Sequence, residues 1–297
     1  MDRLDAMDLF LEVMDAGSLS AAGRRRRIPL ATVSRKIADL EAHLGTRLFN
    51  RSGRRLAVTE AGEAYALACR RILDDVAAAD RAAAGENEEP KGRLVVTAPL
   101  VFGRLHVLPI ATAFLKAHPS ISMHLVFSDR IVDLSEDHVD LAVRIGALPD
   151  SSLVATRVGT IRRMVCASPA YLEARGVPQT PADLIGHDCV GFGTGLSQGR
   201  WFFREGGKDS EIAPRPRLVV NTAEAAIDAA VAGLGLTQIL SYQAAAARRA
   251  GTLVPVLEAF SREPSPVSLV HGGGRLLPRK VRAFIDVAAP LLRAALA

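Results

Sequence analysis

The sequence predicts a multidomain α+β protein, in which a winged helix-turn-helix and a long helix precede a region of alternating strands and helices. Three observations support this fold class. Apolar residues recur at helical spacing through the first quarter of the 297-residue chain. A polar break follows, and beyond it short apolar strands alternate with helices. Positive charge, finally, is concentrated in one small part of the helical region.

The first helix is defined by apolar side chains every three or four positions between Leu4 and Met14. The sequence AGS ends it, and Ser18 is positioned to cap a second, short helix, LSAAGRRRR. Gly23 weakens this second helix, because glycine has a low helix propensity. The tripeptide IPL then makes a turn.

A third helix is predicted from about Ala31 to Leu44. It carries one apolar stripe, and Gly45 is placed to end it. The stripe consists of Val33, Ile37, Leu40 and Leu44. Two helices joined by such a tight turn, the second amphipathic, match the helix-turn-helix signature.

Residues 47–62, RLFNRSGRRLAVTEAG, predict a small hairpin with RSGRR at its tip and with Leu56 and Val58 facing the core. Thr59 can cap a long fourth helix from Glu60 to about Ala84. The apolar seam of that helix is narrow, so it suits pairing with a second copy of the chain. The seam consists of Tyr65, Ala68, Ile72, Val76 and Ala79.

The net charge is +5, but its distribution is uneven. Residues 18–58 contain ten Arg or Lys side chains against Asp39 and Glu41, a net +8, so the remainder of the chain carries −3. A concentrated basic patch on a compact domain is the electrostatic footprint of a polyanionic partner.

The polar stretch GENEEPKG, residues 85–92, is the clearest composition break and is interpreted as a domain boundary. The alternation of strands and helices beyond it predicts α/β layering around largely parallel sheets.

Three widely spaced cysteines, Cys69, Cys166 and Cys189, form no CxxC and indicate neither a disulfide framework nor a zinc site. We expect no metal and no cofactor. The acidic N-terminus does not look like a signal peptide, and no apolar run is expected to approach the roughly 18 residues of a membrane span. We therefore expect a cytoplasmic protein with no membrane partner.

Two sets of motifs resemble a known family. The stretch DLFLEVMDAGSLSAA…TVSRKIADLEAHLGTRLFNRSGRRLAVTEAG resembles the N-terminal signature of the LysR-type transcriptional regulators. The later runs GRLHVLPIATAFLKAHPSISM, DLAVRIGALPDSSLVATRVG and NTAEAAIDAAVAGLGLTQI resemble their effector domain, in particular its CrgA-like branch. The resemblance covers nearly the whole chain.

The resemblance implies a winged helix-turn-helix over residues 1–59, a dimerising linker helix over 60–88 and an effector-binding domain over 89–297. That domain would have two lobes resembling type 2 periplasmic binding proteins, lobe 1 at about 92–163 and 266–297 and lobe 2 at about 164–265. The implied partners are promoter or operator double-stranded DNA, an unidentified small-molecule effector, a second copy in a homodimer, a dimer of dimers (a homotetramer), and RNA polymerase.

In a helix-turn-helix, N-terminal residues of the second helix meet base edges in the major groove. By motif position these are Leu30, Ala31, Ser34 and Arg35. Arg35 can hold guanine in a bidentate manner, worth roughly 1–3 kcal/mol of discrimination, and Leu30 and Ala31 can touch thymine methyl groups. The residues expected to touch phosphate are Ser18, Ser20, Thr32, Lys36, Arg51 and Arg54. The wing arginines could also enter a minor groove.

The chain departs from the family pattern at the turn. Arg26 and Arg27 stand where relatives usually have an apolar residue and Gly or Asn, so Arg26 must snorkel or reach a phosphate. Pro29 and Leu30 also differ from the common turn residues, so base preference is not transferable from relatives. For the four arginines Arg24–Arg27, a solvated helix face is the open alternative.

Effector contacts are expected where strands of the two lobes end, since α/β folds bind ligands outside the carboxyl ends of their strands. The candidates are Thr97, Pro99, Leu100 and Phe102; Ser128, Asp129 and Arg130; Arg144, Ile145 and Gly146; and Asn221, Thr222 and Thr237. Relatives often place Ser or Thr at Pro99 to hold an effector carboxylate, so proline disfavours an acidic effector. For Arg144 and Thr237, a structural role is an equally good alternative to effector binding.

Two strings suggest an alternative, a serine hydrolase. Residues 195–199, GLSQG, match G-x-S-x-G, and residues 271–274 match HGGG, which would give Ser197, Asp228 and His271 as a triad. The glycine-rich surroundings of Ser197 do not resemble a strand-turn-helix elbow, so this hypothesis is disfavoured. A solute-binding protein would fit the lobes but leaves the +8 segment unexplained.

Overall fold

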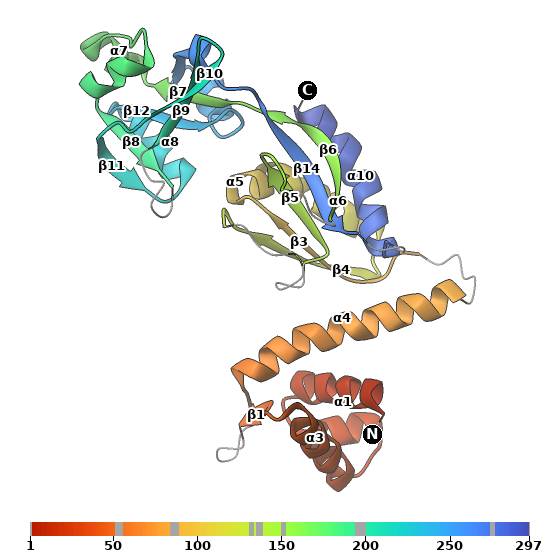
Figure 1. Ribbon diagram of the computed structural model, residues 1–297. Coiled ribbons are helices and arrows are strands. Elements are labelled where there is room, and N and C mark those ends of the chain that lie inside the picture. The colour runs from red at the N-terminus through yellow and green to blue at the C-terminus, as the bar shows by residue number, and fades with distance from the viewer. Residues whose placement is uncertain are drawn as a thin grey trace. The chain divides into compact units, whose positions relative to one another are not determined.

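The computed structural model describes residues 2–50, 56–83, 89–130, 134, 139–149, 153–193, 200–273 and 277–296 (Figure 1). The chain divides near Gly92 into two compact units, which are described separately below. The predicted combination of a helix-turn-helix with a mixed α/β region is confirmed.

Three helices build the N-terminal unit: α1 (Arg3–Ala16), α2 (Leu19–Arg26) and α3 (Leu30–Leu44). The predicted helix ends are confirmed, because the Ser18 hydroxyl accepts a hydrogen bond from Ala21 N at 3.1 Å and Gly45 ends α3 in the left-handed region. The helices pack around fully buried side chains, among them Phe10, Val33, Ile37, Leu40 and Phe49.

The turn between α2 and α3 is tight enough to need a small residue on one side. A Cβ at Gly23 would stand 2.9 Å from the Ile28 carbonyl oxygen, so the glycine that weakens α2 also allows the turn to close. Arg27 ends α2 with φ 57° and ψ 38°, a left-handed conformation that L-residues with a Cβ adopt at a cost of about 1–2 kcal/mol.

The wing is short. Strands β1 (Phe49–Asn50) and β2 (Ala57–Val58) pair antiparallel, while the predicted hairpin tip, residues 51–55, lies outside the described residues. Leu56 and Val58 pack against the core of the unit, as predicted.

Helix α4 (Glu60–Ala83) follows the wing, and Thr59 caps it as predicted. The Thr59 hydroxyl accepts from Gly62 N at 3.0 Å and donates to the Arg47 carbonyl at 2.7 Å. One side of α4 buries Ala66 and Cys69 against the core of the unit.

The second unit contains two five-stranded sheets with helices around them (Figure 1). The first sheet has the order β4-β3-β5-β14-β6 and forms lobe 1. Its elements are β3 (Gly92–Ala98), α5 (Leu100–Phe102), the π-helix η1 (Gly103–Val107), α6 (Leu108–Ala117), β4 (Ile121–Phe127), β5 (Leu141–Ile145), β6 (Leu153–Ile161), β14 (Ser265–Gly272) and α10 (Arg279–Leu296).

The second sheet has the order β11-β8-β12-β7-β13 and forms lobe 2, with β9 and β10 as a separate hairpin. The lobe consists of β7 (Arg163–Ala167), α7 (Pro169–Arg175), the 3-10 turn η2 (Pro181–Gly186), β8 (Cys189–Phe192), β9 (Trp201–Glu205), β10 (Lys208–Ile212), β11 (Pro216–Val220), α8 (Ala223–Val231), β12 (Leu236–Leu240), α9 (Ala245–Arg249), β13 (Val254–Val256) and the 3-10 turn η3 (Glu258–Phe260).

Both sheets are mixed rather than largely parallel, which corrects the sequence prediction. Strands β3 and β5 are parallel, as are β8 with β11 and with β12, but β14 runs antiparallel to β5 and β6. The chain leaves lobe 1 along β6 and comes back along β14. Because these two strands are neighbours in the sheet, the returning strand runs antiparallel to the departing one.

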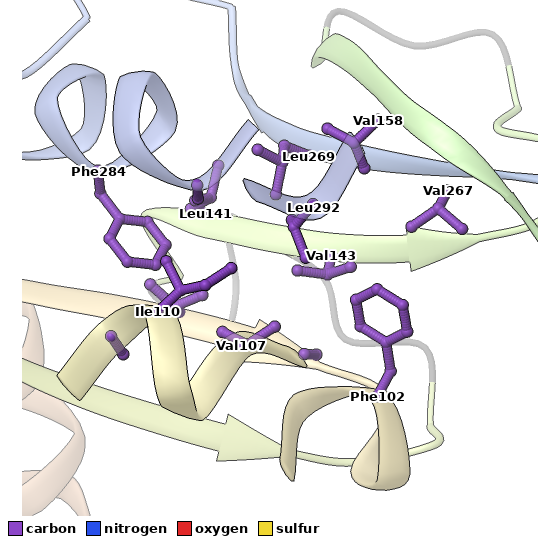
Figure 2. Packing of buried hydrophobic residues seen from close by; sticks show 14 of the residues in the cluster. Phe102, Val107, Ile110, Leu141, Val143, Val158, Val267, Leu269, Phe284 and Leu292 are labelled. Carbon is purple, nitrogen blue, oxygen red and sulfur yellow. The ribbon is translucent and has the colours of Figure 1, made fainter. Parts of the chain in front are cut away.

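The core of lobe 1 lies between the sheet and two helices. Figure 2 shows Phe284 and Leu292 of α10 gathered with Ile110 of α6 and with Leu141 and Val143 of β5. The two helices also meet each other through Phe114 and Phe284, whose ring centroids lie 5.2 Å apart in a T-shaped arrangement.

One stretch of this core, Leu100–Ala117, is long and apolar enough to span a membrane by length and composition alone, with a mean hydropathy of 1.4. The expectation that no run approaches this length was therefore wrong. The stretch instead supplies core side chains, as a helix buried in a globular protein does. They are Val101, Phe102, Val107, Ile110, Ala111 and Phe114.

Arg27→Gly is expected to raise the free energy of unfolding of the N-terminal unit by about 0.5–1 kcal/mol. The relief of left-handed strain exceeds the greater chain entropy of glycine in the unfolded state. Urea unfolding followed by far-UV circular dichroism measures the change. Arg27→Ala removes the same charge but keeps the strained backbone, so it should remain near the wild type. The transition of Trp201, the single tryptophan, buried in lobe 2, should not move. Equal stabilities of the Gly and Ala variants would contradict the prediction.

Gly62→Ala is expected to destabilise the same unit by about 1–3 kcal/mol, although alanine is the better helix former. A Cβ at this position would stand 2.3 Å from the Leu48 carbonyl oxygen and 2.8 Å from Val58 Cγ1, so the wing and α4 would have to separate. The same urea titration tests this, and an unchanged or higher midpoint would show that the junction can relax.

Candidate nucleic-acid interface and ligand site

Helix α3 has one buried and one exposed face. Val33, Ile37 and Leu40 are fully buried, whereas Leu30 is 52% exposed and Arg35 is also exposed. Ala31 shares the exposed side, and Thr32 and Ser34 are half-buried. Every residue predicted to meet base edges thus lies in the first turn and a half of α3, and none belongs to the buried stripe.

An acidic edge on α1 pairs with several of the cations around α3. Asp5 forms ion pairs with both Arg26 (3.5 Å) and Lys36, and Asp8 forms one with Arg26. The guanidinium of Arg26 therefore does not extend into solvent, because it is paired with the carboxylates of α1. Lys36, predicted to touch phosphate, is likewise paired in this structure, and that role stays a prediction.

Three of the exposed arginines near the turn and the start of α3 have no ion pair among the described residues. Arg24, Arg27 and Arg35 form no ion pair with any residue in the part of the chain that the structure describes. The other predicted wing contacts, Arg51 and Arg54, lie outside the described residues. The positive potential around α3 is therefore supplied by side chains with no internal counter-charge.

The hydroxyl groups of Ser18 and Ser20 lie 3.4 Å apart at the start of α2. Ser18 accepts from Ala21 N, so its O–H remains able to donate. Ser20 is exposed. One of the two hydroxyl hydrogens is used in the bond between the serines, and the other can donate to a negatively charged oxygen at this helix N-terminus.

In the second unit, one side-chain hydrogen bond joins the loops after β3 and β4, because Leu100 N donates to Asp129 Oδ1 at 3.1 Å. Within the loop after β4, Arg130 N donates to Ser128 Oγ at 3.2 Å. Asp129 accepts the first N–H of the turn that follows Pro99, the residue at which the sequence disfavours an acidic effector. These predicted ligand residues lie together at one end of the sheet.

Other predicted ligand residues are committed to the fold. The Thr97 hydroxyl donates to the Val126 carbonyl at 2.9 Å, and Thr237, which is fully buried, donates to the Val190 carbonyl at 3.2 Å. Phe102 is a fully buried core residue. In this conformation none of the three presents its side chain at the surface, and their roles in ligand binding remain predictions.

The remaining candidates lie at the ends of β5 and β11. Arg144 and Ile145 end β5, where Ile145 packs against the core, and Gly146 follows with φ 117°. Asn221 is exposed, and the Thr222 hydroxyl caps α8 by accepting from Ala225 N at 3.3 Å. Among these candidates, the side chain of Asn221 is exposed and a Cβ at Gly146 would meet no atom within 4 Å, so both positions are open to a ligand.

Contacts between the lobes involve residues that the sequence reasoning missed. The Tyr242 ring, at the end of β12, meets Phe102 with centroids 5.4 Å apart, and Arg104 pairs with Glu224 at 3.6 Å. Burial raises the pKa of the Tyr242 phenol and lowers the pKa of the His106 imidazole. The only available signal was position, since Tyr242 follows β12 and Arg104 and Glu224 lie near the start of a helix.

The described residues around the hydrolase motifs do not supply the surroundings that a nucleophile elbow needs. Ser197 lies outside the described residues, but strand β8 precedes it and strand β9 follows, whereas a nucleophile elbow needs a helix after the serine. His271 Nδ1 lies 2.9 Å from the carbonyl oxygen of its neighbour Gly272, and Asp228 is exposed on α8.

Known proteins resemble this chain over nearly its whole length. The model of the bacterial regulatory helix-turn-helix protein, lysR family, matches residues 4–63, and that of the LysR substrate binding domain matches residues 87–293. An HTH-type transcriptional repressor of Pseudomonas aeruginosa is 34% identical over 288 residues, 96% of this chain and 91% of that protein.

Two solved structures agree. CrgA, a LysR-type transcriptional regulator from Neisseria meningitidis, aligns with TM-score 0.62 and 30% identity over 97% of this chain and 98% of that one. Full-length AphB, a virulence activator of Vibrio cholerae, aligns with TM-score 0.61 and 30% identity, covering 96% and 98%. Together with the two faces of α3 and the two-lobed second unit, these matches show that the chain belongs to the LysR family of transcriptional regulators.

Proposed function

We propose that this regulator reads its operator through Leu30, Ala31, Ser34 and Arg35, and that an effector bound in the second unit changes this binding. The observation that carries the proposal is the exposure of the first turns of α3 opposite a fully buried stripe. A helix supported in this way can enter a major groove without losing its packing.

The proposed contacts divide into base contacts and phosphate contacts. Arg35 donates two hydrogen bonds to guanine O6 and N7, and the exposed Leu30 and Ala31 contact thymine methyl groups. Ser18, Ser20, Thr32, Arg51 and Arg54 contact phosphate and fix the register. Lys36 can join them by leaving Asp5, since an exposed ion pair is worth only about 0–1 kcal/mol.

The DNA-binding form is proposed to be a dimer formed through α4, and two dimers to associate through their second units into a homotetramer. Leu67 and Ile72 are 43% and 39% exposed on α4, whereas Ala66 and Cys69 are buried, so apolar area remains for a second copy. A dimer would place two α3 helices roughly 34–36 Å apart on a partly palindromic site.

The effector is proposed to bind among the loops that end β3, β4, β5 and β11, and to change how the two lobes close. The open and closed arrangements of the lobes would then differ by weak contacts such as the exposed Arg104–Glu224 pair, and their free energies would be similar. This is allostery only if the two states bind DNA differently. Unchanged DNA affinity and bend at saturating effector would reject the mechanism.

The protein is proposed to act in the cytoplasm, with RNA polymerase as a partner at the promoter and without catalysis. Ester turnover that disappears in Ser197→Ala would contradict the last point.

Arg35→Ala is expected to weaken binding to the preferred duplex about 5- to 150-fold, from the roughly 1–3 kcal/mol of a bidentate base contact, and to leave binding to random duplex nearly unchanged. Fluorescence anisotropy with both duplexes over a salt series measures this. Asp39→Ala, an exposed change one turn further along α3, is the matched control. Equal losses on both duplexes would show that Arg35 contacts phosphate rather than a base.

A further inference from the structure

The four consecutive arginines, Arg24–Arg27, do not share one environment. Arg26 is 23% exposed and forms ion pairs with Asp5 and Asp8 of α1. Arg25 pairs with Glu12 at 3.3 Å but remains 60% exposed. Arg24 and Arg27 are exposed and have no ion pair among the residues that the structure describes. The run therefore contains one structural cation, one loosely held cation and two uncompensated ones.

The uncompensated arginines and the structural one differ in their surroundings at the end of α2. Arg24 lies in the last turn of α2, and Arg27 is the residue that ends the helix. Arg26 lies on the side that faces α1. The two uncompensated arginines are therefore both exposed at the C-terminal end of α2, whereas ion pairs with α1 hold Arg26.

The backbone at Arg27 supplies a second, independent observation. Arg27 holds a left-handed conformation at φ 57°, which glycine would adopt without the penalty imposed by a Cβ. No ion pair with a described residue repays that penalty. Strained residues of this kind cluster where a side chain has a function outside the fold.

We infer that Arg24 and Arg27 are additional DNA-positioning residues, which contact phosphodiester oxygens beside the groove that receives α3. This inference rests on the proposed function. In a helix-turn-helix the first helix crosses the sugar-phosphate backbone while the second enters the groove. Arg27 stands three residues before Leu30, the first residue of α3, so its guanidinium lies at the groove edge when α3 is inserted. Guanidinium groups bind phosphate independently of sequence, so Arg24 and Arg27 add affinity and fix register without selecting bases.

The test is the salt dependence of DNA binding by the full-length chain. Arg24→Ala and Arg27→Gly are compared with the wild type on the preferred duplex and on random duplex. Because each variant removes one cation from the phosphate backbone, each should reduce the slope of log affinity against log salt by about 1, equally on both duplexes, and the double variant should reduce it by about 2. Arg27→Gly should at the same time resist urea better than the wild type, so its weaker binding cannot come from a damaged fold.

Two ion-paired arginines serve as matched controls. Arg26→Gln removes the cation held by α1, and Arg70→Ala removes one on α4 that pairs with Asp15 at 2.8 Å. Both should keep the wild-type slope, and Arg70→Ala remains informative if Arg26→Gln folds poorly. Wild-type slopes in both Arg24→Ala and Arg27→Gly would overturn the inference, as would an equal reduction of the slope in the controls. Absence of DNA binding by the wild type at low salt would instead overturn the proposed function itself.

Discussion

Burial of the apolar stripe of α3 determines which of its side chains face outward, and the rest of the N-terminal unit depends on this constraint. Val33, Ile37 and Leu40 are fully buried, and each contributes roughly 1.5–3 kcal/mol by leaving water. The partly buried ion pairs of Asp5 with Arg26 and Lys36 remain in contact with water and contribute only about 1 kcal/mol each. Packing therefore orients the helix, and the ion pairs decide which nearby cations remain available to a partner.

Local signals made much of this unit predictable. The caps at Ser18 and Thr59 and the end of α3 at Gly45 depend on residues within three positions, so the sequence contains the whole interaction. The ion pairs of Arg26 and Lys36 with Asp5 join residues 21 and 31 positions apart. Helical periodicity assigns each of them to a face but does not identify its partner, so the sequence could not show which arginine of the run is structural.

The second unit shows the same limit at larger scale. Alternating apolar segments predicted its strands, but strand direction depends on the path between lobes, which periodicity does not record. The chain crosses between the lobes twice, and an arginine from each crossing lies over the ring of Phe202. Arg163 begins β7 and lies 5.8 Å from the ring centroid, and Arg262 precedes β14 and lies 5.5 Å from it. Gln238 fixes the Phe202 backbone through two hydrogen bonds of 3.1 Å. These contacts tie the crossings between the lobes to β9 and β12 of lobe 2.

The charge pattern of the N-terminal unit explains how a domain without excess charge can favour a polyanion. Residues 1–17 hold five acidic and one basic side chain, residues 59–92 hold eight and four, and the +8 segment lies between them. The segments balance in number, so the unit attracts DNA through the separation of its charges rather than through their total. A phosphate backbone that approaches α1 or α4 meets acidic side chains, whereas one that approaches α3 meets arginines. Electrostatic attraction between exposed charges acts over about 8 Å at physiological ionic strength, so this separation of charge favours the approach of a polyanion from the side of α3.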